Sequence, residues 1–279
     1  MKVSKAATIW IDYHRGPIPK KNTVRSFKPI IDQFCLEFGE FEIDQVTSDD
    51  ILRFLNRFTE GNKPYTKRIR YSHLCSFSNF IRNNLDHNLR NPCDSPMVRK
   101  QYRERVVSKW KIIEKETVDE ITFRTTKPRN RLMLELMARG GMRIGEVLKL
   151  RLKGLQDRKL ILQEPKSGRK HELVFIPQKV ADRLREYALE VCKSPDDRIF
   201  PISYEGARVI VAKAGRLVGI KLRPHDLRRH SATDASRSGV PIEIVSKVIL
   251  RHANLSTTQR YLGTMSDVEA IRWIENIYG

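Results

Sequence analysis

The stretch GGMRIGEVLKL, residues 140–150, carries the first clear indication of how the chain folds. Two glycines precede Arg143 within an apolar helical pattern, so the backbone can bend there and approach another segment closely. Arg143 lies among apolar residues that should be buried, and a buried arginine needs a partner. Glu146, three residues later, is on the same helix face and can orient the guanidinium. The stretch predicts an internal Arg–Glu pair, which either takes part in a reaction or only bridges two helices.

A second stretch, PHDLRRH at residues 224–230, places His225 and Arg228 three residues apart at a predicted helix start. That spacing puts both side chains on one side of the helix. The first turn of a helix favours anions, and an arginine there offers two parallel donors to phosphate oxygens. The stretch indicates an anion-binding helix start; the alternative is a simple cap with solvated arginines.

Three further side chains are ordinary when each is considered alone. His252 follows an apolar helical segment, and Tyr261 comes nine residues later, after a polar stretch. Lys166 lies in the turn of a predicted strand pair, Leu160–Gln163 and Glu172–Ile176, where Gly168 permits the chain reversal. A histidine at a helix end is usually a cap, a tyrosine is usually part of a core, and a lysine in a turn is usually solvated.

The pattern of apolar residues in the rest of the chain predicts mainly helices, but this helical pattern is interrupted near residue 86. Residues 86–113 contain two helix-breaking prolines and a densely basic run with few apolar positions, which indicates a linker. Thr117 and Glu120 have capping-box spacing and predict a helix start. The expected helices cover residues 3–14, 23–38, 48–58, 65–84, 180–191, 204–218, 225–238 and 241–249.

The predicted fold class is therefore mainly α with a small β-sheet (α+β). We expect a helical DNA-binding domain over residues 1–105, a basic linker over 106–114 and a larger domain over 115–279. Within the last of these, Ser266 and Glu269 form a second capping-box pattern ahead of an amphipathic helix at the C-terminus.

The net charge of +20 favours a polyanionic partner. The excess is +8 before residue 110 and +12 after it, because the first part holds 20 basic and 12 acidic residues and the second 33 and 21. Both halves are thus expected to contact nucleic acid. Four basic residues at the start of the fourth helix are candidate DNA contacts, although such a run is often only a solvated face: Lys63, Lys67, Arg68 and Arg70.

Other classes of protein are disfavoured by the sequence. No apolar run is long enough for a transmembrane helix, and the N-terminus has no signal-peptide pattern, so we expect a cytoplasmic protein without a membrane partner. The four cysteines have neither CxxC spacing nor zinc spacing to a histidine. The acidic pairs Asp49-Asp50 and Asp196-Asp197 lie in turn-like or helix-start contexts, which argues against a two-metal nuclease.

Taken in order, the motifs resemble those of the tyrosine recombinase family, which includes phage-type integrases and chromosome-dimer resolvases. GGMRIGE is similar to that family's first-arginine motif, PHDLRRHSAT to its second, and LRHANLSTTQRY to its histidine-to-tyrosine segment. EPKSGRKHELVFIP is similar to the hairpin that carries the catalytic lysine. The resemblance covers residues 115–279, while residues 1–105 fit the core-binding domain in general character.

The resemblance implies a catalytic set of Arg143, Lys166, His225, Arg228, His252 and Tyr261. It implies that Tyr261 attacks a DNA phosphodiester and forms a 3′-phosphotyrosyl link, with Glu146 supporting the site. It also implies that the two domains form a C-clamp around double-stranded DNA. Four copies of the chain are expected to assemble on two duplexes, with neighbouring subunits linked by exchange of the terminal helix. The reaction is expected in a prokaryotic, archaeal or viral setting and needs no metal or other cofactor. Arg251 departs from the pattern, because the family usually has glycine before the histidine; we expect it to alter the helix end or to contact a DNA phosphate.

Two alternatives remain at this point. A topoisomerase-like enzyme would cleave DNA in the same way but reseal the same strand. A non-catalytic DNA-binding protein would keep the fold without the reaction, although the complete set of six polar residues argues against it.

Overall fold

The computed structural model describes residues 1–16, 21–103, 112–163, 171–259, 271 and 275. The chain divides into two compact units, Met1–Ser108 and Lys109–Gly279, which are called unit 1 and unit 2 below. Among the described residues, no helix has the length and apolarity needed to cross a bilayer. The predicted linker 106–114 falls largely on residues outside this description.

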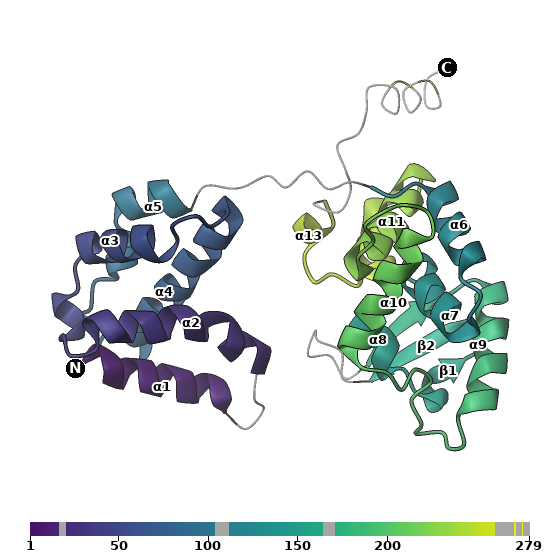
Figure 1. The fold of residues 1–279 in the computed structure, drawn as a ribbon, viewed down its shortest axis with the longest axis horizontal. Coiled ribbons are helices and arrows are strands. Elements are labelled where there is room, and N and C mark those ends of the chain that lie inside the picture. The colour runs from purple at the N-terminus through teal and green to yellow at the C-terminus, as the bar shows by residue number, and fades with distance from the viewer. Residues whose placement is uncertain (17–20, 104–111, 164–170, 260–270, 272–274, 276–279) are drawn as a thin grey trace. The chain divides into compact units, whose positions relative to one another are not determined.

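Unit 1 is helical throughout its described part, with α1 lying along α2 (Figure 1). Its helix α3 begins at a capping box in which the Thr47 hydroxyl accepts from the Asp50 backbone and the Asp50 carboxylate accepts from the Thr47 backbone. The four helices predicted in this part of the chain are confirmed. The elements are α1 Val3–Arg15, α2 Lys21–Phe38, η1 Ile43–Gln45, α3 Ser48–Phe58, α4 Pro64–Asn84, η2 Pro92–Asp94 and α5 Pro96–Tyr102.

Aromatic side chains fill the core of unit 1. The Trp10 and Phe27 rings lie 4.1 Å apart, and Phe34 contacts Phe54 edge-to-face at 5.2 Å. Each of these four side chains is at most 2% exposed. Large rings from several helices bury much apolar area with few rotatable bonds, so they hold a small helical unit together efficiently.

The expectation that a linker begins near residue 86 was wrong. Residues 92–94 form η2 and residues 96–102 form α5, and both pack on the core of unit 1. Tyr71 donates to the Cys93 carbonyl at 3.0 Å, and Tyr102 donates to Asn56 at 2.6 Å. The sparse apolar residues here, Cys93 and Val98 among them, are nearly all directed inward, so their low number did not mean that the segment is exposed.

Unit 2 combines helices with a three-stranded antiparallel sheet of order β1-β2-β3. Strand β2 pairs with β3 in a register that sets Leu160 opposite Val174 and Leu162 opposite Glu172. All four of these side chains are buried, so a carboxylate lies on the inner face of the sheet. The strand pair is confirmed, and β1 is an additional strand. The strands are β1 Leu155–Gln156, β2 Lys159–Gln163 and β3 His171–Phe175.

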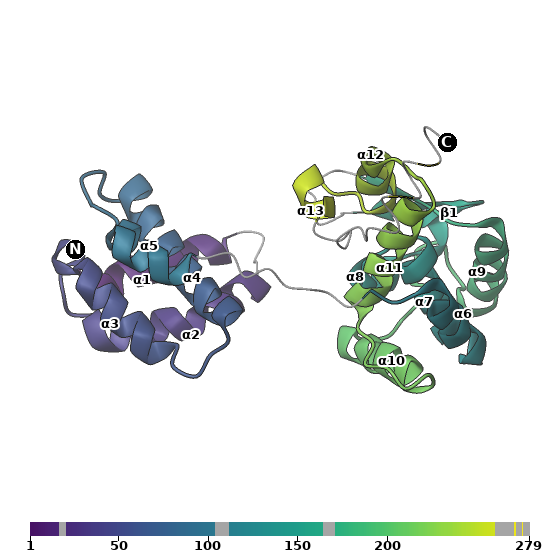
Figure 2. The same cartoon turned by 90° about the horizontal axis from the view of Figure 1, so that it is seen from above.

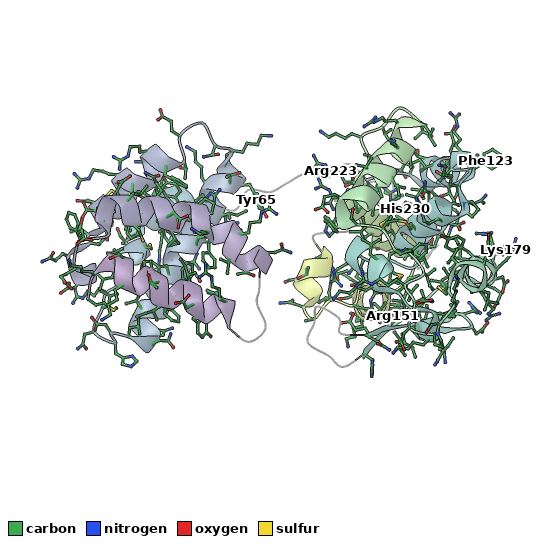
Figure 3. The ribbon with its side chains drawn as sticks, turned by 60° about the horizontal axis from the view of Figure 1, so that its bottom comes forward. Tyr65, Phe123, Arg151, Lys179, Arg223 and His230 are labelled. Carbon is green, nitrogen blue, oxygen red and sulfur yellow. The ribbon has the colours of Figure 1, made fainter. Side chains whose placement is uncertain are left out.

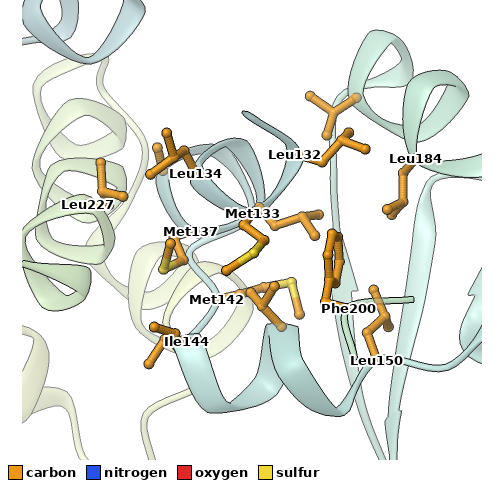
Figure 4. Packing of buried hydrophobic residues seen from close by; sticks show 14 of the residues in the cluster. Leu132, Met133, Leu134, Met137, Met142, Ile144, Leu150, Leu184, Phe200 and Leu227 are labelled. Atoms are coloured by element: carbon orange, nitrogen blue, oxygen red, sulfur yellow. The ribbon is translucent and has the colours of Figure 1, made fainter. Parts of the chain in front are cut away.

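Helix α7 is the centre of unit 2 and lies between α9 and α11 (Figure 2). Its buried side chains include Met133 and Met137, which pack with Met142 and Phe200 (Figure 4). Flexible methionines fill the irregular space where several helices meet. The helices are α6 Lys115–Arg124, α7 Pro128–Arg139, α8 Ile144–Lys149, η3 Leu152–Gly154, α9 Gln178–Val191, α10 Tyr204–Arg216, α11 Pro224–Arg237, α12 Ile242–Ile244, η4 Val245–Ile249 and α13 Leu255–Gln259.

One local prediction in unit 2 was wrong, and another was right about the helix but not about its type. Helix α6 begins at Lys115 with Glu114 as its N-cap, so Thr117 and Glu120 form no capping box. The helix expected over residues 241–249 is present, but only the short α12 is α-helical, and it continues into η4, a π-helical turn in which the Leu250 amide donates to the Val245 carbonyl at 2.8 Å. A π-turn inserts one residue into the helical repeat, and such turns are frequent at functional sites. The predicted fold class, mainly α with a small sheet, is confirmed.

Candidate active site

Arg143 and Glu146 form the first part of the candidate site, at the corner between α7 and α8. The two glycines end α7, and Arg143 is the N-cap of α8. The Arg143 backbone amide donates to Glu146 Oε2 at 2.8 Å, and its Nη1 donates to Glu146 Oε1 at 2.5 Å. The predicted Arg–Glu pair is therefore present, and the guanidinium is only partly buried, with 31% of the side chain exposed. Its remaining donors are available to a ligand.

Gly141 is required at this corner because of its backbone and its neighbours. Its φ is +57°, which strains residues with a β-carbon. A β-carbon there would lie 2.7 Å from the carbonyl oxygen of Ile249. The glycine thus lets the α7–α8 corner touch the end of η4, as the sequence indicated for this stretch.

Arg228 holds three segments together from inside unit 2. Its side chain is completely buried, although it starts from the second turn of α11. Nη1 donates to the carbonyl of Gly141 and Nη2 to the carbonyl of Leu250. These bonds join α11 to the α7–α8 corner and to the end of η4, and they fix the orientation of a planar cation in a site with little water.

His252 follows η4 and is oriented by a chain of hydroxyls. Its amide donates to the Ser246 carbonyl at 2.9 Å, and its Nδ1 lies 3.0 Å from Thr258 Oγ1. The Thr258 hydroxyl in turn lies 2.8 Å from Ser246 Oγ. Burial, followed by the charges of Arg228 and Arg143, lowers the pKa of His252 from 6.5 to about 4. The imidazole is therefore neutral at physiological pH.

His225 lies at the start of α11 and is exposed at the surface. Partial burial of the ring, and then the charges of Arg228, Arg229 and Arg143, lower the pKa of His225. His225 and His252 thus experience the fields of the same two arginines, Arg143 and Arg228. The structure brings these four predicted residues together, although they lie up to 109 positions apart in the sequence.

Arg251 lies inside the protein and not at its surface. The side chain is 3% exposed, and its Nη2 donates to Glu146 Oε2 at 2.7 Å. We expected either a change at the helix end or a contact with a DNA phosphate. The residue does end η4 in the left-handed region, with φ at +52°, and its guanidinium is directed toward a carboxylate. The contact with DNA phosphate stays untested.

The two remaining members of the predicted catalytic set, Lys166 and Tyr261, lie outside the described residues. The nearest described elements are β2 and β3 for the lysine and α13 for the tyrosine. The terminal capping-box pattern at Ser266 and Glu269 is outside them as well.

The four basic residues predicted to contact DNA in unit 1 lie at or near the start of α4. Lys63 is the exposed N-cap, and Lys67 and Arg68 are half-buried in the next turn. Arg70 is held by its own unit, because its Nη1 donates to the Ser26 carbonyl at 3.1 Å and its guanidinium lies 5.7 Å from the centre of the Phe58 ring. Lys63, Lys67 and Arg68 are freer to reach a partner than Arg70 is.

Sequence reasoning missed two features of the site. Glu172 lies on the buried face of β3, 3.6 Å from Arg251 Nε, and only the alternation of the strand could have indicated that it is directed inward. A cavity of about 810 Å³ adjoins His225 and the start of α11. Arg208, Lys221 and Arg223 line it, and Arg223 is marked at the start of α11 in Figure 3, with His230 further along the helix.

The chemistry that this cluster favours is the stabilisation of negative charge by fixed donors. Two guanidiniums and two neutral imidazoles converge, and the cations are held by backbone carbonyls and by a carboxylate. Preorganised donors of this kind stabilise an oxyanion most where charge develops during a reaction. Among the described residues, no group of three or more His, Cys, Asp or Glu is placed to hold a metal ion.

Comparisons with known proteins agree with this reading. The model of the phage integrase family matches residues 111–266. A tyrosine recombinase from Pseudothermotoga lettingae is 35% identical over 149 residues, which are 51% of this chain and 52% of that protein. Tyrosine recombinase XerA from Pyrococcus furiosus is 28% identical over 93% of this chain and 91% of the relative.

A solved structure shares the fold over the whole chain. The Tn1549 transposon integrase, in complex with transposon right end DNA, superposes with a TM-score of 0.77 at 16% identity and full coverage of both chains. The predicted family and the predicted class of enzyme are confirmed, and neither the topoisomerase-like nor the non-catalytic alternative is favoured. The chain therefore belongs to the phage integrase family of tyrosine recombinases.

Proposed function

We propose that this protein cuts and rejoins double-stranded DNA at a specific site, with Tyr261 as the nucleophile. The observation that carries the proposal is the convergence of Arg143, Arg228, His225 and His252 in unit 2. A phosphodiester has one negative charge, and attack builds a second on its oxygens. A clamp of two fixed guanidiniums suits that doubly charged state better than the ground state, which is the condition for acceleration.

The roles of the other residues follow from the proton balance. The Tyr261 hydroxyl has an ordinary pKa of about 10, so a base must remove its proton during attack. His225 is suited to this, because the charges and burial around it lower its pKa and keep it neutral. The P–O5′ bond breaks as the phosphotyrosyl bond forms, and Lys166 gives the leaving 5′-oxygen a proton. His252 adds a hydrogen bond to a phosphate oxygen.

Rejoining reverses these steps with a new 5′-hydroxyl. The phosphotyrosyl bond keeps the energy of the broken phosphodiester, so the proposed sequence contains no step that uses a nucleotide or a metal. Exchange between two duplexes breaks four strands, one per active site, which favours a homotetramer linked through the segment after Tyr261. The substrate places the reaction where the DNA of a prokaryotic or viral genome is found, in the cytoplasm.

Unit 1 is proposed to hold the duplex by its backbone through Lys63, Lys67 and Arg68. Such contacts release counterions, so each one should make the slope of log affinity against log salt steeper by about 0.9. The net charge of +20 supports this binding mode.

The test is the capture of a covalent intermediate on DNA. Wild-type protein is incubated with a DNA duplex that contains its recombination site. The duplex is nicked near the cleavage point so that the short product diffuses away. Covalent protein–DNA adducts are then resolved on a denaturing gel. Wild type should form an adduct and Tyr261→Phe should form none, since phenylalanine has no nucleophilic oxygen. Tyr187→Phe is the matched control, because that ring stacks on Phe200 in the core. The proposal would be contradicted if Tyr261→Phe formed the same adduct as wild type, or if wild type formed no adduct.

A second assay separates recombination from simple relaxation. Two DNA fragments of different length, each with one site, should give products that join the two fragments. Relaxation of a supercoiled plasmid without any joined product would favour the topoisomerase-like reading.

A further inference from the structure

Arg251 has a backbone conformation that arginine rarely adopts. Its φ is +52°, and Asp157 is the one other described non-glycine residue with positive φ. Asp157 lies in an exposed turn, and aspartate tolerates this region comparatively well. For a residue such as arginine the conformation is strained, and it persists where the surrounding structure enforces it. The contacts of the side chain show what holds it.

The Arg251 guanidinium is directed inward and contacts three different segments. Nη1 donates to the Ile249 carbonyl at 2.7 Å, and Nη2 donates to Glu146 Oε2 at 2.7 Å and lies 3.4 Å from the Gly141 carbonyl. Nε lies 3.6 Å from Glu172 Oε2 on β3. The side chain therefore joins the end of η4 to the α7–α8 corner and to the inner face of the sheet.

Glu146 is shared between two arginines. Its Oε1 accepts from Arg143 Nη1, while its Oε2 accepts both from the Arg143 backbone amide and from Arg251. A carboxylate held at one oxygen by Arg251 has less freedom to rotate, so it presents its other oxygen to Arg143 in one orientation. Charges from both sides lower the pKa of Glu146 despite its burial, and it stays ionised.

Glu172 completes the charge balance. Its side chain is 3% exposed, and Arg251 is its ion-pair partner within the described residues. The described charged groups around Arg251 are two carboxylates, the cation of Arg143, and the cation of Arg228, which donates to the same Gly141 carbonyl. The two carboxylates offset two of these three positive charges, so the cluster keeps a net positive charge, and the free donors of Arg143 remain for a ligand.

We infer that Arg251 is a positioning residue for DNA cleavage: it fixes the Glu146 carboxylate and thereby aims Arg143 at the scissile phosphate. The inference rests on the proposed function, since it names a further residue of the same site. In this role Arg251 does not touch DNA. It acts through Glu146, and Glu172 anchors it from the sheet.

The test compares cleavage by Arg251 variants on two kinds of DNA. Arg251→Gln removes the charged fork, and Arg251→Gly also removes it while suiting the positive φ, so that the fold is kept if the glutamine variant unfolds. Single-turnover adduct formation should fall about 10- to 100-fold in both, the effect of losing one charge-assisted hydrogen bond in the transition state. DNA affinity should stay within about twofold, because Arg251 is buried.

The matched control is Arg185→Gln, which removes a guanidinium paired at 3.5 Å with Asp157 on the surface of the same unit. It should cleave like wild type. Thermal unfolding of every variant is followed alongside, so that rates are compared only between folded proteins.

The second DNA carries a methylphosphonate at the scissile position, in which a methyl group replaces one charged oxygen. With less charge to neutralise, a misaligned Arg143 costs less, so the defect of both Arg251 variants should shrink by about tenfold. A purely structural role would reduce the rate on both substrates by the same factor.

Three outcomes bear on the inference. A cleavage defect that shrinks on the neutral phosphate supports it. Normal cleavage by both variants, or an equal defect on both substrates, overturns it while leaving the proposed function intact. Wild-type protein that forms no Tyr261-dependent adduct overturns the proposed function itself, which is visible before any Arg251 variant is examined.

Discussion

The two units differ in what they bury. In unit 1 the buried polar side chains among the described residues are neutral ones, Thr59, Ser78 and Asn91, and the core is built from aromatic rings. In unit 2 the described buried residues include Glu135, Glu172, Arg228, His230 and Arg251. Both units have a continuous apolar core, so the difference does not come from a lack of hydrophobic side chains in unit 2.

The difference shows where the molecule keeps groups that are expensive to bury. A buried ion loses its hydration and rarely makes a protein more stable than an apolar group of the same size. In unit 2 the buried arginines gather at one place, around the α7–α8 corner and the end of η4. Unit 1 is thus arranged for packing, and unit 2 keeps charges in fixed positions at some expense of stability. The predictions below test this contrast.

The largest effect is expected for Arg228→Ala in unit 2. The variant leaves the carbonyls of Gly141 and Leu250 without their buried donor, which should lower the free energy of unfolding by about 3–5 kcal/mol. Cleavage should fall about 10²- to 10³-fold, as for other losses of a fixed oxyanion donor. Denaturant unfolding and single-turnover cleavage measure the two effects. Arg139→Ala, which breaks an exposed pair with Asp119, is the control and should change neither the free energy of unfolding nor the cleavage rate. Cleavage at the wild-type rate by Arg228→Ala would contradict the proposed contrast between the units.

In unit 1, Phe54→Ala should lower the free energy of unfolding by about as much as Arg228→Ala does in unit 2, although it removes no charge. Phe54 is fully buried and contacts Phe34 and Phe58, so truncation leaves a cavity and should destabilise unit 1 by about 3–5 kcal/mol. Hydrogen exchange followed by mass spectrometry should show faster exchange in peptides of unit 1 only. Leu36→Ala is the control, since that side chain is 79% exposed. Equal acceleration in unit 2 would show that the units do not unfold separately.

The smallest effect concerns the pH dependence of unit 2. The pKa of His252 is about 4 in the folded protein and near 6.5 when exposed, so the unfolded state binds a proton more readily. The contribution of His252 to the free energy of unfolding should therefore be fully present above pH 6.5, and it should be lost as the pH falls toward 4. Because His252 is only partly buried, its share is about 1–2 kcal/mol after allowance for solvent screening.

The measurement is the melting temperature of wild type and His252→Gln between pH 7 and pH 4. The variant should lose less stability on acidification, because it has no imidazole to protonate beside Arg228 and Arg143. His87→Gln, at an exposed position of unit 1, should follow the wild-type curve. Parallel curves for wild type and His252→Gln would show that this histidine is not the sensitive group.

Much of the fold was predictable because its signals are local. Hydrophobic periodicity placed α1 to α4 and α9 to α11, and strand alternation with a glycine turn placed β2 and β3. The pair Arg143–Glu146 was predictable as well, although Arg143 is the N-cap of α8 and not part of the helix, because the N-cap and the third helical residue face each other at a helix start. These features depend on residues that are close in the sequence.

Other features were not predictable, since they depend on which segments meet. The few apolar residues of 92–102 did not show that η2 and α5 complete the core of unit 1. The π-turn at 245–249 looks like ordinary helix in the sequence, because its apolar residues have helical spacing. A basic residue such as Arg251 is usually at the surface, and only the placement of Glu146 and Glu172 around it makes burial possible.

By itself the sequence determined the identity and order of the motifs between residues 140 and 261, and with them the family. Tertiary structure alone decided what holds those groups. Arg228 donates to carbonyls 87 and 22 residues away, and Arg251 reaches a carboxylate 105 residues away. Local propensity carries no information about contacts at such separation, because they exist only after helices and sheet have packed and excluded water around them.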